Sequence, residues 1–173
     1  MKKLTVYHVL TMTNGMARHP IMDAEWLKNY LAEPVVAEPG TEFLYNSSGS
    51  CLLGAIVKKK TGKGMREFLK EFLFDKIGID GERFQIFRFP DGYDAEPGTA
   101  SVTEDNLRLA ILFMNYGNWN GEQIIAEDWM HMAMSCQIST EPNGGTEDYR
   151  HGYGFQLWNS AIPGVYRFDG GQG

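Results

Sequence analysis

A regular spacing of apolar residues between positions 65 and 77 constrains most strongly what this chain can fold into. The apolar residues recur at intervals of three and four, and they are Met65, Phe68, Leu69, Phe72, Leu73 and Ile77. Such spacing places the side chains along one face of an α-helix. Gly78 follows, and a glycine directly after a helix commonly ends it. The pattern predicts an amphipathic helix that must pack against other elements of a globular domain.

Weaker helix signals occur on both sides of this segment. Threonine and aspartate favour the N-cap of a helix, where they accept backbone N–H groups, and glycine or proline favours its end. These signals predict a helix after Thr5 that ends at Gly15, a helix after Asp23 that ends before Pro34, a helix from Cys51 to Gly62, a helix after Thr103 that ends at Gly117, and a helix over residues 126–135. Residues 43–49 have no helical period, and we expect an ordered loop there.

Strand signals are fewer and gather near the end of the chain. Residues 80–100 are rich in Gly, Pro and Asp and predict a loop, with a short strand near residues 84–89. Residues 153–158 and 165–168 are rich in aromatic and β-branched residues, and the turn pair Pro163-Gly164 lies between them. They predict an antiparallel hairpin. Because an isolated hairpin is marginally stable, we expect it to belong to an incomplete sheet.

Charge and hydropathy argue against two classes of function. The net charge is −6, whereas nucleic-acid binders gather Lys and Arg on one face. No apolar run reaches the roughly 20 residues that cross a bilayer, so we expect neither a nucleic-acid partner nor a membrane span. The N-terminus lacks the apolar core of a signal peptide. A cytoplasmic location is the default expectation, and the compartment stays open.

Cysteine and tryptophan positions give expectations about the core. Cys51 and Cys136 lie far apart without the spacing of a metal site. We expect two buried thiols, with a disulfide or a metal site as the alternative. Trp119, Trp129 and Trp158 are expected to pack in the core. The histidines show no metal-ligand spacing either, so the sequence predicts no metal and no cofactor.

Several segments, in order along the chain, resemble motifs of one enzyme family. Residues 4–16 resemble L-T-x-x-H-L-L-T-x-T-S-G, residues 39–47 resemble P-G-T-x-F-x-Y-S-N, residues 98–114 resemble G-x-x-S-T-x-x-D-L-x-x-x-x-x-x-L, residues 121–125 resemble G-x-x-I-L-S, and residues 151–158 resemble Y-G-Y-G-W. Each phrase is weak alone. Together they resemble the class C β-lactamase-like serine hydrolases, the penicillin-recognising family.

The resemblance implies an α+β fold and a division of the chain. It implies mainly the helical subdomain of a β-lactamase or transpeptidase-like fold, with an incomplete antiparallel sheet. Residues 1–173 would be a partial domain, with a helical region over 1–136, a loop over 137–151 and a β-hairpin over 152–173. A strand edge left unpaired would invite a second copy of the chain, so we expect a homodimer.

The family's chemistry is acyl transfer, and the resemblance assigns roles by position. A serine in Ser-x-x-Lys attacks a carbonyl, and the tyrosine of Tyr-x-Asn moves the proton. Tyr45 would be that tyrosine, and Ser47 stands where the asparagine usually does. Asp169, Gly170 and Gly171 would replace the strand motif His-x-Gly, and the N–H of Gln172 could donate to the oxyanion.

The nucleophile motif of the family is missing from these residues. No Ser, Thr or Cys is followed three positions later by Lys. We therefore expect part of a serine hydrolase of an ester, amide or β-lactam, acting on a small molecule or peptide. The chain alone should be inactive. The alternative is a non-catalytic binding or interaction module that keeps the helical fold.

Two site residues carry alternatives of their own. An unperturbed phenol has a pKa of about 10, so Tyr45 needs nearby cations to act as a base. The alternative interpretation is that Tyr45 is a packed aromatic residue without a catalytic role. Asp169 brings a negative charge where a cation would help bind penicillin carboxylates, which favours neutral esters or amides, or substrates with an amino group. Its alternative is a turn aspartate that accepts the following glycine N–H groups.

Overall fold

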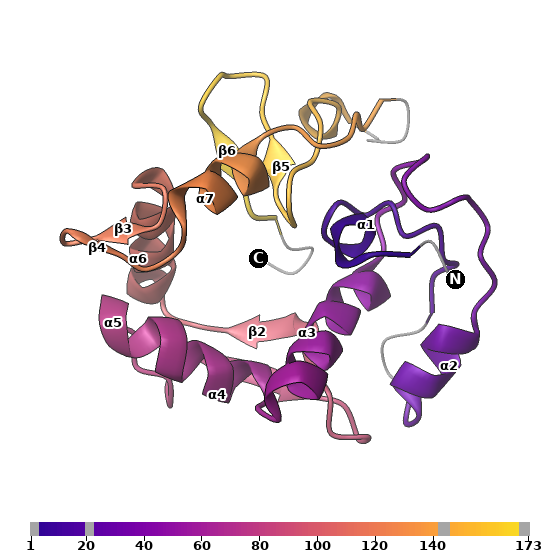
Figure 1. Cartoon of the computed structure of the whole chain (residues 1–173), viewed down its shortest axis with the longest axis horizontal. Coiled ribbons are helices and arrows are strands. Elements are labelled where there is room, and N and C mark those ends of the chain that lie inside the picture. Colours follow the sequence, from indigo (N-terminus) through magenta and orange to yellow (C-terminus); the bar gives the residue numbers. More distant parts are fainter. Residues whose placement is uncertain (1–3, 20–22, 142–145, 170–173) are drawn as a thin grey trace.

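The computed structural model describes residues 4–19, 23–141 and 146–169. The helices are α1 (Val6–Leu10), α2 (Trp26–Ala32), α3 (Ser47–Thr61), α4 (Met65–Leu69), α5 (Asp75–Ile77), α6 (Thr103–Met114) and α7 (Glu127–Met134), with a π-helical turn η1 (Lys70–Phe74) between α4 and α5 and a 3-10 turn η2 (Glu147–Tyr149). Figure 1 shows these elements arranged around the periphery of the molecule, with α3 between α1 and α4.

The clearest sequence pattern is confirmed. Residues 65–77 form a continuous helical run through α4, η1 and α5 that ends at Gly78, whose φ is 74°. Thr5 caps α1, because its side chain accepts the N–H of His8. Gly62 closes α3 with a φ of 75°. Left-handed backbone is the conformation that glycine adopts with least strain.

Other predicted helix boundaries are wrong. Asp23 is not a cap, because α2 starts later, with Glu25 at its N-cap. Instead, the Asp23 carboxylate accepts the Glu25 N–H at 3.0 Å, ahead of the helix. Thr103 lies inside α6, where Val102 is the N-cap and no side chain caps the helix. α1 ends at Leu10, well before Gly15. Short polar side chains can bind the backbone in turns as well as at caps, so the sequence signal was ambiguous.

Three short antiparallel hairpins complete the fold. They pair β1 (Gln85–Arg88) with β2 (Asp94–Ala100), β3 (Asn118–Trp119) with β4 (Glu122–Gln123), and β5 (Trp158–Asn159) with β6 (Tyr166–Arg167). The strand near residues 84–89 is confirmed, but its partner β2 lies where we expected a loop. The C-terminal hairpin is confirmed with two residue pairs. Residues 153–157 form no strand, so it is shorter than predicted.

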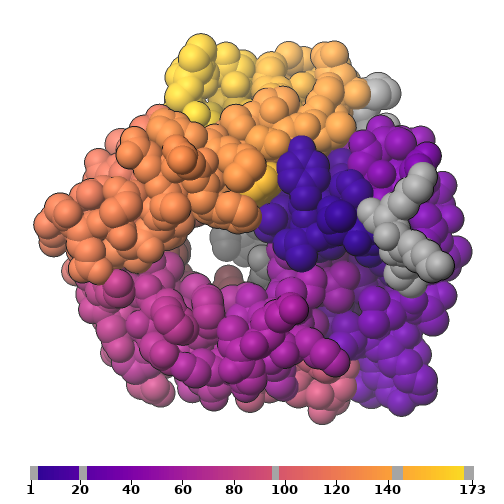
Figure 2. Space-filling view, in the orientation of Figure 1, coloured from indigo at the N-terminus to yellow at the C-terminus, as the bar shows by residue number. Residues whose placement is uncertain are grey.

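The buried apolar residues form four clusters around the ring of elements. The first joins α1, α2 and α3, and the second joins α4, α5 and α6. The third surrounds Phe43 and Trp158, and the fourth lies between α7 and Leu157. Figure 2 shows this face of the molecule hollowed at its centre, between the magenta surface of α4 and α5, the orange surface of α7 and the indigo surface of α1.

Expectations about the core are met in part. Trp158 is buried, but Trp129 is 44% exposed, so its core assignment is wrong. Trp119 is half-buried at the edge of the second cluster. Cys51 is buried as expected, whereas Cys136 is exposed, and the two do not form a disulfide. Among the helices that the structure describes, none has the length and apolarity needed to cross a membrane.

Candidate functional site

Tyr45 lies in the loop that leads into α3 and faces the C-terminal hairpin. Its ring stacks on the indole of Trp158 in β5, with 5.8 Å between ring centroids and 20° between planes. The side chain is 37% exposed. Tyr45 therefore contacts the hairpin and still presents surface to solvent. This arrangement brings the loop before α3 against the hairpin that precedes Asp169.

Asn46 fixes the backbone next to Tyr45. Its side chain is 1% exposed, and its Oδ1 accepts the Gly49 N–H at 3.2 Å, which caps α3. Its Nδ2 donates to the carbonyl of Met16 at 3.1 Å and lies 3.4 Å from that of Ala17. A buried amide with satisfied hydrogen bonds sets a single local geometry. Asn46 thus positions the start of α3 against residues 16–17.

Gly49 permits a close approach of two polar side chains. A Cβ at this position would lie 2.6 Å from Nδ2 of Asn14. That nitrogen donates to the Tyr30 hydroxyl at 3.2 Å, and burial raises the pKa of Tyr30 to about 12. The phenol of Tyr30 therefore stays neutral and hydrogen-bonded in the core. Glycine at position 49 leaves the space that this contact needs.

Gln156 ties the C-terminal region to the site. Its backbone N–H donates to the Leu10 carbonyl at 3.0 Å, and its Nε2 donates to the same oxygen at 3.1 Å. Its Oε1 accepts the hydroxyl of Ser50, in the first turn of α3, at 2.5 Å. The residue has a φ of 60°, a strained conformation for a side chain of this size. These contacts place Trp158, two residues later, against Tyr45.

Trp158 is the centre of an aromatic cluster. Besides the Tyr45 ring, its indole meets Tyr149 edge-on at 4.7 Å, Tyr153 at 4.8 Å and Phe43 at 5.4 Å between centroids. Edge-to-face contacts of this kind add to the stabilisation from burial. The indole therefore connects the loop before α3 with the hairpin and with η2.

Asp169 follows the hairpin and is paired. Its carboxylate accepts the hydroxyl of Tyr149, and this hydrogen bond raises the pKa of Tyr149. A guanidinium nitrogen of Arg167 lies 3.9 Å from the same carboxylate, and that guanidinium sits 4.8 Å above the Tyr149 ring. The negative charge is thus partly offset by Arg167. Gly170, Gly171 and Gln172 lie outside the described residues.

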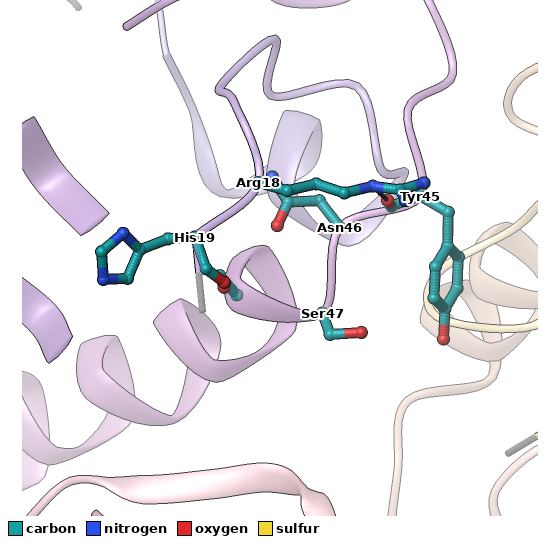
Figure 3. Close-up of a pocket in the computed structure, with 6 residues that line it drawn as sticks. Arg18, His19, Tyr45, Asn46 and Ser47 are labelled. Carbon is teal, nitrogen blue, oxygen red and sulfur yellow. Dashed lines mark hydrogen bonds between the residues drawn. The ribbon is translucent and has the colours of Figure 1, made fainter. Parts of the chain in front are cut away.

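A small pocket opens beside Tyr45. It has a volume of about 210 Å³, and the residues that line it are Arg18, His19, Tyr45, Asn46, Ser47 and Ser48. Figure 3 shows the hydroxyl groups of Tyr45 and Ser47 on the same side of the loop, with Arg18 running above it. Drug-sized ligands occupy sites of roughly 300–1,000 Å³, so the pocket suits a small group.

His19 was missed by sequence reasoning and has a fixed orientation. Its two ring nitrogens lie 2.7 Å from Glu33 Oε1 and 2.8 Å from Asp23 Oδ2. The hydrogen bond with Glu33 is the main cause that raises the pKa of His19. A hydrogen bond from Asn29 is the main cause that lowers the pKa of Asp23 to about 2. The His19 carbonyl accepts the Ser48 hydroxyl at 2.8 Å, so this charged cluster braces the start of α3.

The residues that the sequence and the structure assign to the site overlap in part. Tyr45 and Ser47, which the motif assigns to the site, line one pocket. Arg18 and His19 come just after the motif at residues 4–16, and no local pattern marks them. In the part of the chain that the structure describes, no group of three His, Cys, Asp or Glu side chains is arranged to hold a metal ion.

Comparisons with known proteins place this chain in a family. The family model described as Beta-lactamase matches residues 2–173, so the chain belongs to the β-lactamase family. A curated relative, the monacolin J acid methylbutanoyltransferase of Aspergillus terreus, is 29% identical over 104 residues, which cover 51% of this chain and 25% of the relative.

Solved structures of the family share the fold. The octameric penicillin-binding protein homologue from Pyrococcus abyssi matches with a TM-score of 0.69 at 20% identity, over 89% of this chain and 43% of that one. The penicillin-binding protein from Bacillus halodurans matches with a TM-score of 0.69 at 20% identity, over 94% of this chain and 58% of that one. The chain thus spans about half the length of these structures and a quarter of the curated relative.

Proposed function

We propose that this chain is the helical part of a serine hydrolase that works through an acyl-enzyme, and that Tyr45 is its proton carrier. The observation that carries the proposal is the placement of Tyr45. Its ring lies between the pocket and the indole of Trp158, and the backbone beside it is fixed by Asn46. A rigidly held, partly exposed phenol is what proton transfer at a substrate requires.

The nucleophile would come from a Ser-x-x-Lys segment outside these 173 residues, since none of them forms that motif. Its lysine would also supply the cation that lowers the pKa of a phenol. Without the nucleophilic serine, no acyl-enzyme forms, and Tyr45 has no reaction in which to transfer a proton. The chain alone should therefore be inactive in acyl transfer.

Ser47 and the strand edge complete the proposed site. Ser47 is half-buried and lines the same pocket as Tyr45. Its hydroxyl can donate or accept a hydrogen bond, so it would bind substrate where the family uses an amide. Asp169 would flank the opposite side, with Gly170 and Gly171 beside it, and the N–H of Gln172 would donate to the oxyanion.

Asp169 bears on the substrate. Tyr149 and Arg167 already contact the Asp169 carboxylate, so Asp169 should attract a substrate amine only weakly. As an acid, Asp169 also cannot bind a substrate carboxylate in the way that a cation at this position would. We therefore propose esters or amides ahead of amino-bearing substrates and of β-lactams, with an uncharged group on the side of the substrate that faces Asp169. Penicillin hydrolysis as fast as ester hydrolysis, by a polypeptide that carries the nucleophile, would contradict this preference.

The test of the function is the substitution Tyr45→Phe in a polypeptide where these residues are joined to a Ser-x-x-Lys segment. General acid–base catalysis contributes about 100-fold or more, so we expect kcat for ester hydrolysis to fall by about that factor. Tyr7→Phe is the matched control, because Tyr7 is similarly exposed but bonds Gln137 away from the pocket. Equal rates in the Tyr45 variant and the parent would show that Tyr45 is not the proton carrier, and a parent that hydrolyses no ester would favour the non-catalytic binding module.

A further inference from the structure

Arg18 is the ionised side chain that runs along the pocket beside Tyr45. It is exposed, and its Nε donates to the Tyr45 carbonyl at 3.1 Å. This bond ties the guanidinium to the same backbone that positions the phenol. Within residues 4–19, 23–141 and 146–169, the structure gives its two terminal nitrogens no hydrogen bond and no ion pair. Four N–H donors are therefore available on a side chain that is already oriented.

The charges around the pocket favour an anion. No carboxylate is among the lining residues. The nearest acids in the cluster, Asp23 and Glu33, are both bonded to the His19 ring. In Figure 3 that ring points away from Tyr45 and Ser47. Arg18 is then the charged group that a ligand beside Tyr45 would meet.

We propose that this pocket binds a carboxylate through Arg18, and that the substrates are esters or amides whose acyl group ends in a carboxylate. The substrate part of this inference rests on the proposed function. A guanidinium matches a carboxylate in two parallel hydrogen bonds, and the Ser47 hydroxyl can add a third. The pocket volume of about 210 Å³ limits the group to a short chain, such as the half-ester of a small dicarboxylic acid.

The position of this anion site distinguishes the substrates from penicillins. The penicillin carboxylate would be bound at the strand edge, where Asp169 stands. Arg18 instead lies in the loop before α2, beside the start of α3. The carboxylate and the scissile bond would thus belong to one small molecule, with the charge on the Arg18 side and a neutral group towards Asp169.

Binding to the 173-residue chain tests the inference without any catalysis. Monomethyl glutarate would be titrated while the NMR signal of the Arg18 Nε–H group and the backbone signals of Ser47 and Ser48 are followed. Loss of a charge-assisted hydrogen bond costs about 1.5–3 kcal/mol, so we expect Arg18→Ala to weaken binding at least about tenfold. Arg18→Lys should recover part of the affinity, and neutral dimethyl glutarate should bind as weakly as the half-ester binds Arg18→Ala.

Arg66→Ala provides the matched control. Arg66 is a half-buried arginine on α4 whose guanidinium lies 3.8 Å from Glu82, and its removal should leave the dissociation constant unchanged. Equal affinity of the parent and Arg18→Ala, equal affinity for the diester, or no binding by the parent would each overturn the carboxylate site. Since this titration needs no nucleophile, its failure is separable from a failure of Tyr45→Phe to slow hydrolysis.

Discussion

The two segments that meet at Tyr45 are held in place by different means. The loop before α3 is fixed by hydrogen bonds of the buried Asn46 side chain to three backbone groups. The β5–β6 hairpin has only two residue pairs of its own. Its position depends mainly on the ring contacts of Trp158 with Tyr45 and Tyr149. Hydrogen bonds from Gln156 to Leu10 and from Asn159 to Met134 add to these contacts.

This difference assigns separate tasks to the two segments. Buried polar networks specify a single geometry because any displacement leaves groups unsatisfied. Aromatic packing tolerates more adjustment, since its contacts are less directional than hydrogen bonds. The loop should therefore hold Tyr45 in place even when the hairpin loosens, whereas the hairpin should depend on the loop.

The largest expected effect comes from cutting the contact between the segments. Trp158→Ala removes a buried indole and should lower the free energy of unfolding by about 4 kcal/mol, as measured by urea denaturation. The hairpin should lose protection from hydrogen exchange, while the amides of α3 keep theirs. Trp129→Ala, at an exposed position, should cost less than half as much. Equal loss of protection in α3 and the hairpin would contradict the separation of the two segments.

Removal of the Asn46 side chain should have the next largest effect. Asn46→Ala removes the donor to the Met16 and Ala17 carbonyls and the side-chain acceptor of the Gly49 N–H. Unsatisfied buried groups and a lost N-cap together should cost about 3 kcal/mol in the same denaturation experiment. Ser47→Ala, one residue further, changes a half-buried hydroxyl and should cost less than about 0.5 kcal/mol. Similar costs for the two variants would show that Asn46 does not organise the loop.

Alanine substitutions at two glycines with similar backbone conformations can show whether the hairpin unfolds together with the rest of the protein or before it. Gly62, at the end of α3, and Gly164, in the β5–β6 turn, have φ of 75° and 79°, and a Cβ at either would meet open space. Alanine at a left-handed position costs about 1 kcal/mol. Gly62→Ala should show this cost in global unfolding. Gly164→Ala should lower the free energy of global unfolding by less, because a hairpin that opens before the rest of the protein contributes only part of this cost to the global transition.

The smallest expected effect is the pH dependence of the contacts that His19 makes with Asp23 and Glu33. The pKa of His19 is raised, mainly by its hydrogen bond with Glu33. Its stabilising contribution is therefore complete below pH 6.5 and is lost as the pH rises through the folded pKa. The lowered pKa of Asp23 acts in the opposite sense, since its contribution is lost as the pH falls from 3.8 towards 2.

The variant His19→Gln tests this direction. Urea midpoints measured between pH 5 and 9 should differ most from the parent protein at the acid end, and the gap should close as the pH rises. His131→Gln is the control, because His131 is exposed on α7 and pairs loosely with Glu127 at 3.6 Å. A gap that widens with rising pH would show that the imidazolium between Asp23 and Glu33 does not stabilise the fold.

Sequence patterns predicted the parts of the fold that depend on local spacing. The helical run from residue 65 to residue 77 ends at Gly78, as the apolar spacing and the glycine after it predicted. The strand β2 was missed because Gly and Pro within residues 94–100 favour a loop. The residues on either side of them pair with β1, and residues 96–98 lie at a register irregularity between those pairs. The start of α3 was placed late, because the cap of Asn46 lies inside a segment without helical period.

The sequence named pocket residues only where they belong to a family motif. Tyr45 and Ser47 came from the resemblance, and the structure places both on one pocket. Arg18 enters the pocket because the chain turns back past residues 45–48, and such a long-range approach leaves no periodic signal. His19 is half-buried and lies between the carboxylates of Asp23 and Glu33, four and fourteen positions later. No local sequence rule connects residues at these spacings.

The central claim is that these residues hold the proton carrier of an acyl-transfer site but not its nucleophile. The direct measurement is the intact mass of the folded 173-residue chain after exposure to a fluorophosphonate and, separately, to a fluorescent penicillin. The account predicts an unmodified mass and no fluorescence with either reagent, while a serine hydrolase used as a positive control is labelled. Stoichiometric labelling at a serine of this chain would contradict it.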